Sequence, residues 1–506
     1  MAKIIKRAAI AGAFIVLAII MLASCTKDDG TIKYKSVKGG YEVVGLVDKN
    51  AENIVIPESF NGKAVVGIAR EAFRGSSVKG VSIPESVKSI GLNAFEFCLS
   101  LTRVELASPD SLADASLENL YSSPFSNGAE LYVGGSKVTD ISFSGERIGD
   151  YAYAGCSSIE NVTLNGVKRI GVGSFKDCVS IISVDFGNAL ESISSNAFSG
   201  NSLVSVSLPE SCGSIGHSAF SYNAKLESVS LPTAITRIPD RAFSNCSALV
   251  NINIDNVEEI GAYAFYRCEG LAQIDLSEKL TRIGEYAYYG SGLVKINIPE
   301  GSALEFIGES AFRGCTSLEE AYLDRARGLK TIEKSAFEFC ESLSDLTLPS
   351  SLESLGDWAF SGCDSLKYTM SGGVGYIGNA ENKFVMAHKF IDHERTRIAI
   401  SDKARFVHTG AFKDAKHILS VRMVGGVVSI GAQAFAFCSS IEEFVLPSTL
   451  RIIGDGAVMG CTALSSVKFM GTSDQWNQSS NPNYVKKGTN WRYNAGSYKI
   501  SYNFVP

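Results

Sequence analysis

The stretch LESVSLPTAITRIPDRAFSNC, residues 226–246, decides the fold. Its segment SVSL, residues 228–231, alternates polar and apolar side chains, which is the period-two pattern of a short strand with one buried face. Pro232 ends this strand, because proline lacks the N–H that a continuing ladder needs. Ile238 then returns to the core, and Phe243 fills it before a polar turn. Such a unit cannot bury its apolar side alone, so it requires neighbours of the same kind.

The same plan recurs along most of the chain, marked by an aromatic residue that follows a small one. In the regular runs this marker returns every 22 to 25 residues, and two longer gaps measure 58 and 52 residues. The markers are Phe73, Phe95, Tyr153, Phe175, Phe198, Phe220, Phe243, Phe265, Tyr288, Phe312, Phe337, Phe360, Phe412 and Phe435, with Val458 as a degenerate last copy. A period of this length predicts a repeat solenoid. We expect a right-handed, β-rich, leucine-rich-repeat-like solenoid of about 15 repeats, with short parallel strands stacked into ladders.

The first 25 residues have the pattern of an export signal. The basic segment MAKIIKR precedes an uncharged stretch, residues 8–23, which is shorter than the roughly 20 residues that a membrane-spanning helix needs. LASC, residues 22–25, resembles a bacterial lipobox, which implies cleavage before Cys25 and a lipid anchor on that cysteine. TKDD, residues 26–29, resembles the export tag of Bacteroidota surface lipoproteins. These resemblances imply an exported outer-membrane lipoprotein that is exposed on the cell surface.

The repeat and its interruptions divide the chain into segments. We expect, in chain order, a signal peptide (1–24), a tether with the start of an N-terminal cap (25–40), N-terminal repeats (41–107), an irregular insert (108–140), central repeats (141–366), a strand-rich interruption (367–405), C-terminal repeats (406–470) and a C-terminal cap (471–506). A cap is required at each end, because an open strand edge promotes aggregation.

The repeat itself points to a family. IGLNAFEFCLSL, residues 90–101, and IGAQAFAFCSSI, residues 430–441, share an Ile-Gly pair, then Ala-Phe, then a cysteine. This pattern resembles the leucine-rich-repeat surface proteins of the BspA type, which occur in oral and gut bacteria and in some protist parasites. The resemblance covers residues 41–469 and implies attachment to a cell surface and adhesion to host proteins or other cells.

Composition and motifs favour binding over catalysis. The 47 basic and 53 acidic residues give a net charge of −6 without a long run of one sign, so we expect no nucleic-acid partner. The chain has neither the G-x-S-x-G pattern of a nucleophile elbow nor the G-x-x-x-x-G-K-[ST] pattern of a phosphate-binding loop. We therefore expect no enzyme activity and no cofactor.

The cysteines and histidines are expected to be structural. Ten of the twelve cysteines lie three residues after the repeat aromatic, which predicts a buried ladder of thiols and leaves sporadic disulfides between adjacent units open. Four of the five histidines lie in or beside the second interruption. Their spacing does not match a zinc pattern such as H-E-x-x-H, so we expect surface histidines on a hairpin.

Two groups of side chains are candidates for ligand binding. Outward residues of the strands form two polar columns, and a second group of tyrosines adjoins the core aromatics. The candidates are Asn251, Gln273 and Lys295 in the first column, Asn253, Asp275, Asn297 and Tyr322 in the second, and Tyr266, Tyr286 and Tyr289 beside the core. Polar strands suit an extended partner, and exposed tyrosines offer apolar area with a polar end.

The sequence is compatible with two functions. The first is an adhesion scaffold that binds surface proteins of a host or of neighbouring cells, including extracellular-matrix proteins. The alternative is a lipoprotein that captures glycans or nutrients beside an outer-membrane uptake system.

Overall fold

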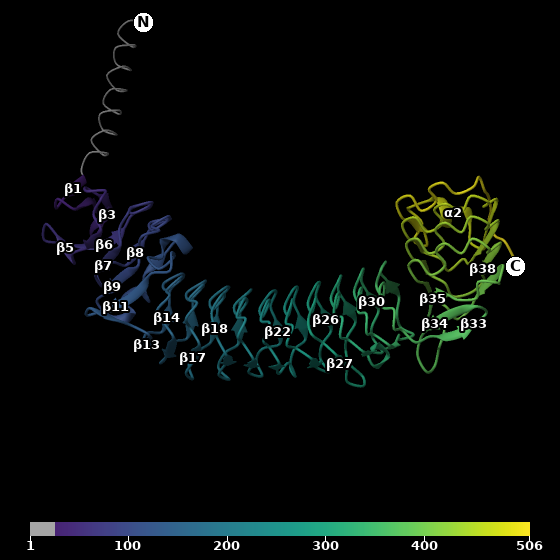
Figure 1. Ribbon diagram of the computed structural model, residues 1–506, viewed down its shortest axis with the longest axis horizontal. Coiled ribbons are helices and arrows are strands. Elements are labelled where there is room, and N and C mark those ends of the chain that lie inside the picture. The colour runs from purple at the N-terminus through teal and green to yellow at the C-terminus, as the bar shows by residue number, and fades with distance from the viewer. Residues whose placement is uncertain (1–25, 506) are drawn as a thin grey trace, which may run out of the picture. The chain divides into compact units, whose positions relative to one another are not determined.

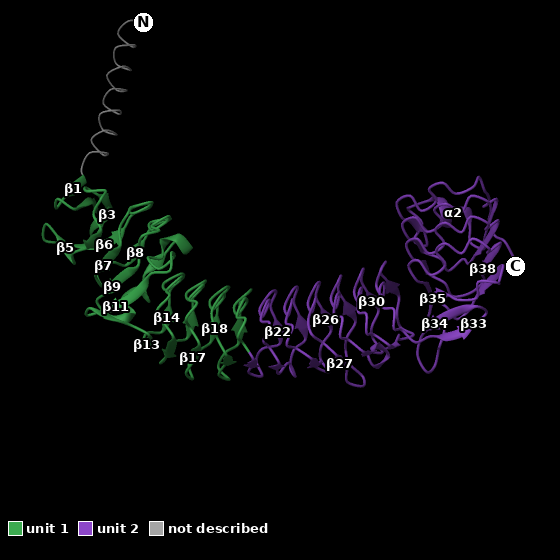
Figure 2. Ribbon diagram, in the orientation of Figure 1, with its two compact units in different colours: residues 1–226 green, residues 227–506 purple. Residues whose placement is uncertain are grey.

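The computed structural model describes residues 26–505, and short strands dominate it (Figure 1). The chain forms two compact units, which Figure 2 colours separately: unit 1 extends to residue 226 and unit 2 begins at residue 227. The expected signal peptide and Cys25 lie outside the described residues.

The strands of unit 1 are β1 (Thr26–Asp28), β2 (Ile32–Val37), β3 (Gly40–Leu46), β4 (Asn53–Val55), β5 (Ser59–Phe60), β6 (Lys63–Ile68), β7 (Gly80–Ile83), β8 (Ser89–Ile90), β9 (Arg103–Leu106), β10 (Ser116–Leu117), β11 (Glu130–Val133), β12 (Ser136–Lys137), β13 (Asp140–Phe143), β14 (Arg147–Ile148), β15 (Asn161–Leu164), β16 (Arg169–Ile170), β17 (Ser183–Asp185), β18 (Ser192–Ile193), β19 (Ser205–Ser207) and β20 (Ser214–Ile215). Its two 3₁₀ turns are η1 (Pro109–Leu112) and η2 (Leu120–Ser122).

The strands of unit 2 are β21 (Ser228–Ser230), β22 (Arg237–Ile238), β23 (Asn251–Ile252), β24 (Glu259–Ile260), β25 (Gln273–Asp275), β26 (Arg282–Ile283), β27 (Lys295–Asn297), β28 (Phe306–Ile307), β29 (Glu320–Tyr322), β30 (Thr331–Ile332), β31 (Asp345–Thr347), β32 (Ser354–Leu355), β33 (Thr369–Ser371), β34 (Val374–Ile377), β35 (Met386–Phe390), β36 (Arg397–Ile400), β37 (Phe406–Val407), β38 (Ser420–Met423), β39 (Ser429–Ile430), β40 (Glu443–Leu446), β41 (Ile452–Ile453), β42 (Ser466–Phe469), β43 (Lys486–Lys487) and β44 (Lys499–Ser501). Its helical elements are η3 (Leu323–Arg325) and α2 (Ser473–Asn477).

Each regular turn of the chain has three sides. In unit 2 the first side is the parallel sheet β25-β27-β29-β31, and the second is the parallel sheet β22-β24-β26-β28-β30-β32. The third side is a series of tight turns joined from rung to rung by backbone hydrogen bonds, such as Phe243 N–H to Ala264 C=O at 3.0 Å and Phe265 N–H to Ala287 C=O at 2.7 Å. The predicted solenoid of stacked parallel strands is confirmed.

The repeat aromatics form the core of the coil. Phe265, Tyr288, Phe312 and Phe337 are buried. Their rings lie nearly parallel, with successive centroids 5.1, 5.2 and 4.9 Å apart. Offset stacking of this kind stabilises a core beyond the area that the rings bury.

The Ile-Gly pair of the repeat has a steric cause. A Cβ atom at Gly284 would lie 2.6 Å from the carbonyl carbon of Gly261 in the preceding rung. The rungs therefore approach at this corner more closely than a side chain permits, and glycine is the residue that fits.

The cysteine ladder is buried, and its thiols also have a bonding role. All eleven cysteines of residues 26–505 are free and buried. Cys268 donates to the carbonyl of Phe243 at 3.2 Å, and Cys315 donates to the carbonyl of Tyr288 at 3.1 Å, one rung earlier in each case. Burial raises the pKa of Cys315 to about 11, so its thiol keeps the proton that this bond needs.

The solenoid has about 19 turns, more than the 15 repeats read from the markers. Residues 108–140, expected to be an irregular insert, contain β10 and β11, which pair in parallel with β8 and β9, and the ring of Phe125 in this segment is buried and stacks with Tyr153. In the tail, β43 and β44 pair in parallel with β41 and β42, over a buried Trp476. These turns lack the Ala-Phe marker but continue the same ladders.

Antiparallel pairs occur at several places beside the ladders, including β1 with β2, β5 with β6 and β11 with β12. In unit 1, β2 and β3 form a hairpin, and β3 then pairs in parallel with β6. In unit 2, β33, β34 and β35 pair in antiparallel order, and β35 then pairs in parallel with β37. The antiparallel group of β33, β34 and β35 falls within residues 367–405, where the sequence predicts a strand-rich interruption.

Candidate functional site

The two predicted polar columns are real neighbours in the sheet of unit 2. Gln273 pairs with Lys295, and Asp275 pairs with Asn297, across β25 and β27. Gln273, Asp275 and Lys295 are exposed, whereas Asn297 is partly exposed. Side chains also interact along the ladder. The amide of Asn297 donates a hydrogen bond to the carboxylate of Asp275 at 2.5 Å, and Lys295 forms an ion pair with Glu320 at 3.4 Å. The columns therefore form a polar surface whose members hold one another in place.

The two asparagines at the start of the columns differ. Asn251 is exposed and pairs with Ser228 in the ladder. The amide of Asn253 accepts from the N–H of Leu231 at 2.7 Å and donates to its carbonyl at 3.0 Å. Both the oxygen and the nitrogen of the Asn253 amide therefore bond to Leu231 in the preceding rung, so this side chain has a structural role.

The tyrosines beside the core form a compact cluster on the turn side of unit 2. The tyrosine cluster consists of Tyr263, Tyr266, Tyr286 and Tyr289, all partly exposed. Tyr263 stacks on Tyr286 at 4.8 Å, and Tyr266 stacks on Tyr289 at 5.1 Å. Within each rung the two rings lie 5.7 and 5.8 Å apart. Four rings thus make one continuous aromatic surface across two rungs.

Arginines lie against this cluster. The guanidinium of Arg241 lies 4.5 Å from the ring centroid of Tyr263, and that of Arg267 lies 5.6 Å from Tyr266. Cation–π attraction of this kind restricts the rings and leaves donors at the edge of the cluster.

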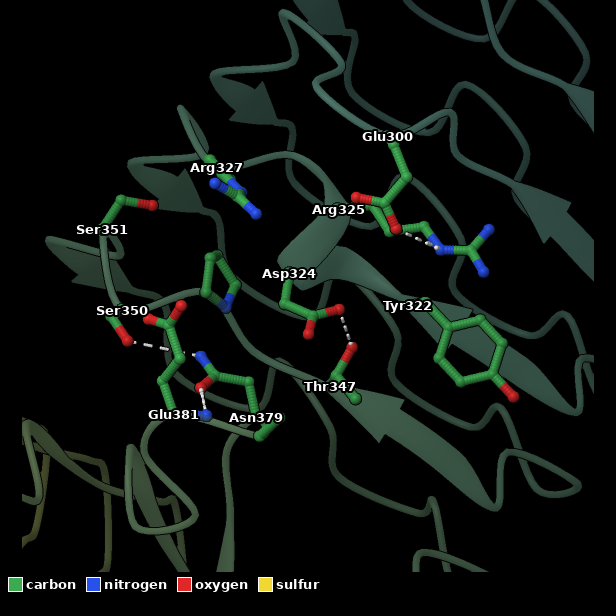
Figure 3. A pocket seen from close by; sticks show the side chains of 12 residues that line it. Glu300, Tyr322, Asp324, Arg325, Arg327, Thr347, Ser350, Ser351, Asn379 and Glu381 are labelled. Atoms are coloured by element: carbon green, nitrogen blue, oxygen red, sulfur yellow. Dashed lines mark hydrogen bonds and ion pairs between the residues drawn. The ribbon is translucent and has the colours of Figure 1, made fainter.

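Tyr322, the last of the predicted column residues, leads into a pocket that the sequence did not reveal. The pocket lies within unit 2, has a volume of about 550 Å³, and is lined from four loops around Glu300, Asp324, Ser350 and Asn379 (Figure 3). These loops follow β27, β29, β31 and β34. Residues about 80 positions apart therefore meet at one place, and of the lining residues only Tyr322 and Thr347 belong to the polar columns that the sequence predicts.

Charged side chains of both signs line this pocket. Arg325 lies 3.6 Å from Glu300 and stands over the ring of Tyr322, 5.2 Å from its centroid. Thr347 donates to Asp324 from the next rung. Figure 3 shows Asp324 near the middle of the group, with Arg327 and Glu381 on its other side.

The histidines differ from the sequence prediction. His408 is 5% exposed, so the prediction of surface histidines is wrong for this residue. Its neighbour His388 lies on the adjacent strand with the two ring centroids 5.2 Å apart, and His408 also approaches Phe360 at 6.2 Å. Nδ1 of His388 and Nε2 of His408 are buried without a hydrogen-bond partner. The parallel pairing of β35 and β37 places both rings beside the core. The alternating pattern of the sequence predicts a hairpin here and does not indicate this pairing.

Burial sets the protonation of this histidine pair. It lowers the pKa of His388 to about 4, and it lowers that of His408 well below its usual range. Both rings are therefore neutral near pH 7. Within residues 26–505, no group of three or more histidine, cysteine, aspartate or glutamate side chains is arranged to hold a metal ion.

The repeat pattern extends well beyond the two copies quoted above. The sequence matches the BspA type leucine rich repeat region in six copies, over residues 47–132, 146–268, 248–367 and 384–484. The chain belongs to the BspA-type leucine-rich-repeat family. The matches cover most of the BspA-type ladders described above, including the tyrosine cluster and much of the pocket.

Solved structures similar to this BspA-type chain include other bacterial leucine-rich-repeat proteins. A leucine rich cell surface protein from Faecalibacterium prausnitzii is 23% identical, with a TM-score of 0.47, over 68% of this chain and 93% of that one. A leucine-rich repeat protein from Bacteroides ovatus is 22% identical, with a TM-score of 0.48, over 94% of this chain and 99% of that one. No curated protein matches the sequence significantly. No helix within residues 26–505 has the length and apolar character needed to cross a membrane.

Proposed function

We propose that this BspA-type chain is a surface lipoprotein that binds a protein partner through the tyrosine cluster and the adjoining rungs. The observation that carries the proposal is the stacking of four partly exposed tyrosines on two rungs, with arginines at the edge. Tyrosine and arginine are the residue types that most often dominate binding energy at protein interfaces. The partner is a surface protein of a host or of neighbouring cells, including proteins of the extracellular matrix.

Preorganisation supports this role of the cluster. Each tyrosine already stacks on another ring, so binding would immobilise little additional side-chain freedom. The polar columns on the strand face offer contacts of little net binding energy, of the kind that surrounds the few dominant residues of an interface. Neither feature requires a metal or a cofactor, and the leucine-rich-repeat solenoid is a typical non-catalytic scaffold for protein interaction.

Export completes the proposed function. The lipobox at residues 22–25 supports a lipid anchor on Cys25, and the acidic tag after it supports display on the outer membrane. The solenoid would then stand outside the cell, where a protein partner can reach its rungs.

Surface plasmon resonance against a panel of extracellular-matrix proteins tests the proposal. The Tyr266→Ser/Tyr289→Ser chain should bind at least about 30-fold more weakly than the wild-type chain, because the anchors of an interface usually contribute 2 kcal/mol or more. Its unfolding transition should stay close to that of the wild type. Tyr222→Ser is the matched control, since Tyr222 is 62% exposed and lies outside the cluster. Equal affinity of the cluster variant and the wild type would contradict the proposal.

A further inference from the structure

We propose that the pocket around Asp324 binds a neutral carbohydrate. It is a second site, on the loops that follow the strands, whereas the tyrosine cluster occupies the turn side of the coil. Its volume of about 550 Å³ lies in the range typical of small-ligand sites.

The charges of the pocket select the class of ligand. Glu300, Asp324 and Glu381 contribute three carboxylates, and Arg325 and Arg327 contribute two guanidinium groups (Figure 3). A strongly anionic ligand would meet the carboxylates, and a cationic peptide side chain would meet the arginines, so neither sign is favoured. A sugar hydroxyl can donate to a carboxylate and accept from a guanidinium, and therefore satisfies both kinds of wall.

Several of these groups retain bonding capacity for a ligand. Among the described residues, Arg327 has no ion-pair partner, the carboxylate of Glu381 accepts no hydrogen bond, and Thr347 engages only one oxygen of Asp324. Charge-assisted hydrogen bonds from such groups are stronger than neutral ones. Tyr322 adds a ring at one side of the pocket, which suits the apolar face of a pyranose.

The walls of the pocket are held in place by bonds that leave the free groups unused. The amide of Asn379 donates to the carbonyl of Leu348 at 2.7 Å and accepts from the N–H groups of Glu381 and Asn382 at 2.9 and 2.8 Å. The N–H of Leu348 donates to the carbonyl of Gly378 at 3.1 Å. The loop of the interruption is thus clamped onto the preceding rung, and the site is formed before a ligand arrives.

An array of immobilised neutral, sialylated and sulfated oligosaccharides, probed with residues 26–506 of the chain, tests this site. We expect retention on neutral glycans, and the strongest of these is then used in isothermal titration. Arg327→Ala and Glu381→Gln should each weaken that binding about tenfold or more, because each removes a charged group that bonds the sugar. Both side chains are exposed, so neither change should disturb the fold. Arg422→Ala is the matched control: this arginine is exposed on β38, away from the pocket, and should bind within twofold of the wild type.

Three results would overturn the proposal. They are retention of sulfated or sialylated glycans alone, absence of retention on any neutral glycan, and equal affinity of Arg327→Ala, Glu381→Gln and the wild type. The Tyr266→Ser/Tyr289→Ser chain separates the two sites, because it should lose the protein partner and keep the sugar. Failure of one site would therefore leave the other intact.

Discussion

Replacing Phe265 with alanine should open a cavity in the core of unit 2. The ring is buried and stacks between Phe243, at 5.8 Å, and Tyr288, at 5.1 Å. A buried Phe→Ala change usually lowers the free energy of unfolding by about 3–5 kcal/mol. Because each stacked pair is worth about 0.5–1.5 kcal/mol beyond the area it buries, and two pairs are lost here, we expect the upper part of that range, about 4 kcal/mol or more.

Hydrogen exchange locates this loss. In a solenoid each rung contacts only its neighbours, so the destabilisation should be strongest near the altered rung. The amides that join it to the rungs on either side include those of Phe243 and Arg267, which donate to Ala264 and Tyr289. A loss of about 4 kcal/mol corresponds to roughly thousandfold faster exchange through local opening, because 1.4 kcal/mol is a factor of ten. Amides around Phe435 should change far less.

Phe339→Ala provides the control, since Phe339 is 45% exposed and its ring lies under the guanidinium of Arg313, 5.4 Å from the ring centroid. Its loss should stay near 1 kcal/mol. Equal loss of stability in both variants, or unchanged exchange around residue 265 in Phe265→Ala, would show that Phe265 is not part of a stacked core.

Three further outcomes are expected, two from the structure and one from the sequence. The cysteines of the folded chain should resist a thiol reagent and react once urea unfolds it, because all eleven are buried; rapid labelling of the native chain would contradict the ladder. Below pH 6.5 both histidines are protonated in the unfolded chain, whereas in the folded chain His388 and His408 stay neutral to a lower pH. The free energy of unfolding should therefore fall between pH 6.5 and 4, by up to about 3 kcal/mol for His388. The variant His388→Gln should show a weaker dependence of this free energy on pH. Cys25→Ala should release the chain from the membrane fraction of cells, and persistent incorporation of labelled fatty acid would disprove the anchor.

The repeat made the core predictable. The aromatic column and the cysteines return with the period of the rung, and residues at one position of a repeat share one environment. The missed rung at Phe125 shows the limit of the marker, because a proline precedes this ring in place of the small residue. The strands of this rung, β10 and β11, pair with β8 and β9 through backbone hydrogen bonds. A pattern of side chains in the sequence does not predict such bonds.

The two candidate sites were predictable from the sequence to different extents. The tyrosine cluster could be read from the sequence because its members recur one rung apart. The pocket could not, because Glu300, Asp324 and Glu381 come from loops of different lengths that interrupt the period. The burial of His408 was missed for a related reason: it depends on the pairing of β35 with β37 across an irregular connection.

Eight cysteine thiols donate to a backbone carbonyl of the preceding unit, toward the start of the chain. Cys268 donates to the unit before its own, and the carbonyl of Phe412 likewise accepts from Cys438 in a later unit. Asn223 has the same part where the cysteine is absent, since its amide donates to the carbonyl of Phe198 at 2.8 Å. A unit that carries this cysteine thus brings a donor for its predecessor, whereas in the unit of Phe198 the side-chain amide N–H of Asn201 is buried without a hydrogen-bond partner. Where two successive units both carry the cysteine, recombination between copies can add or delete a whole unit and leave the bond to the preceding carbonyl in place, so the solenoid can change its length there without compensating substitutions.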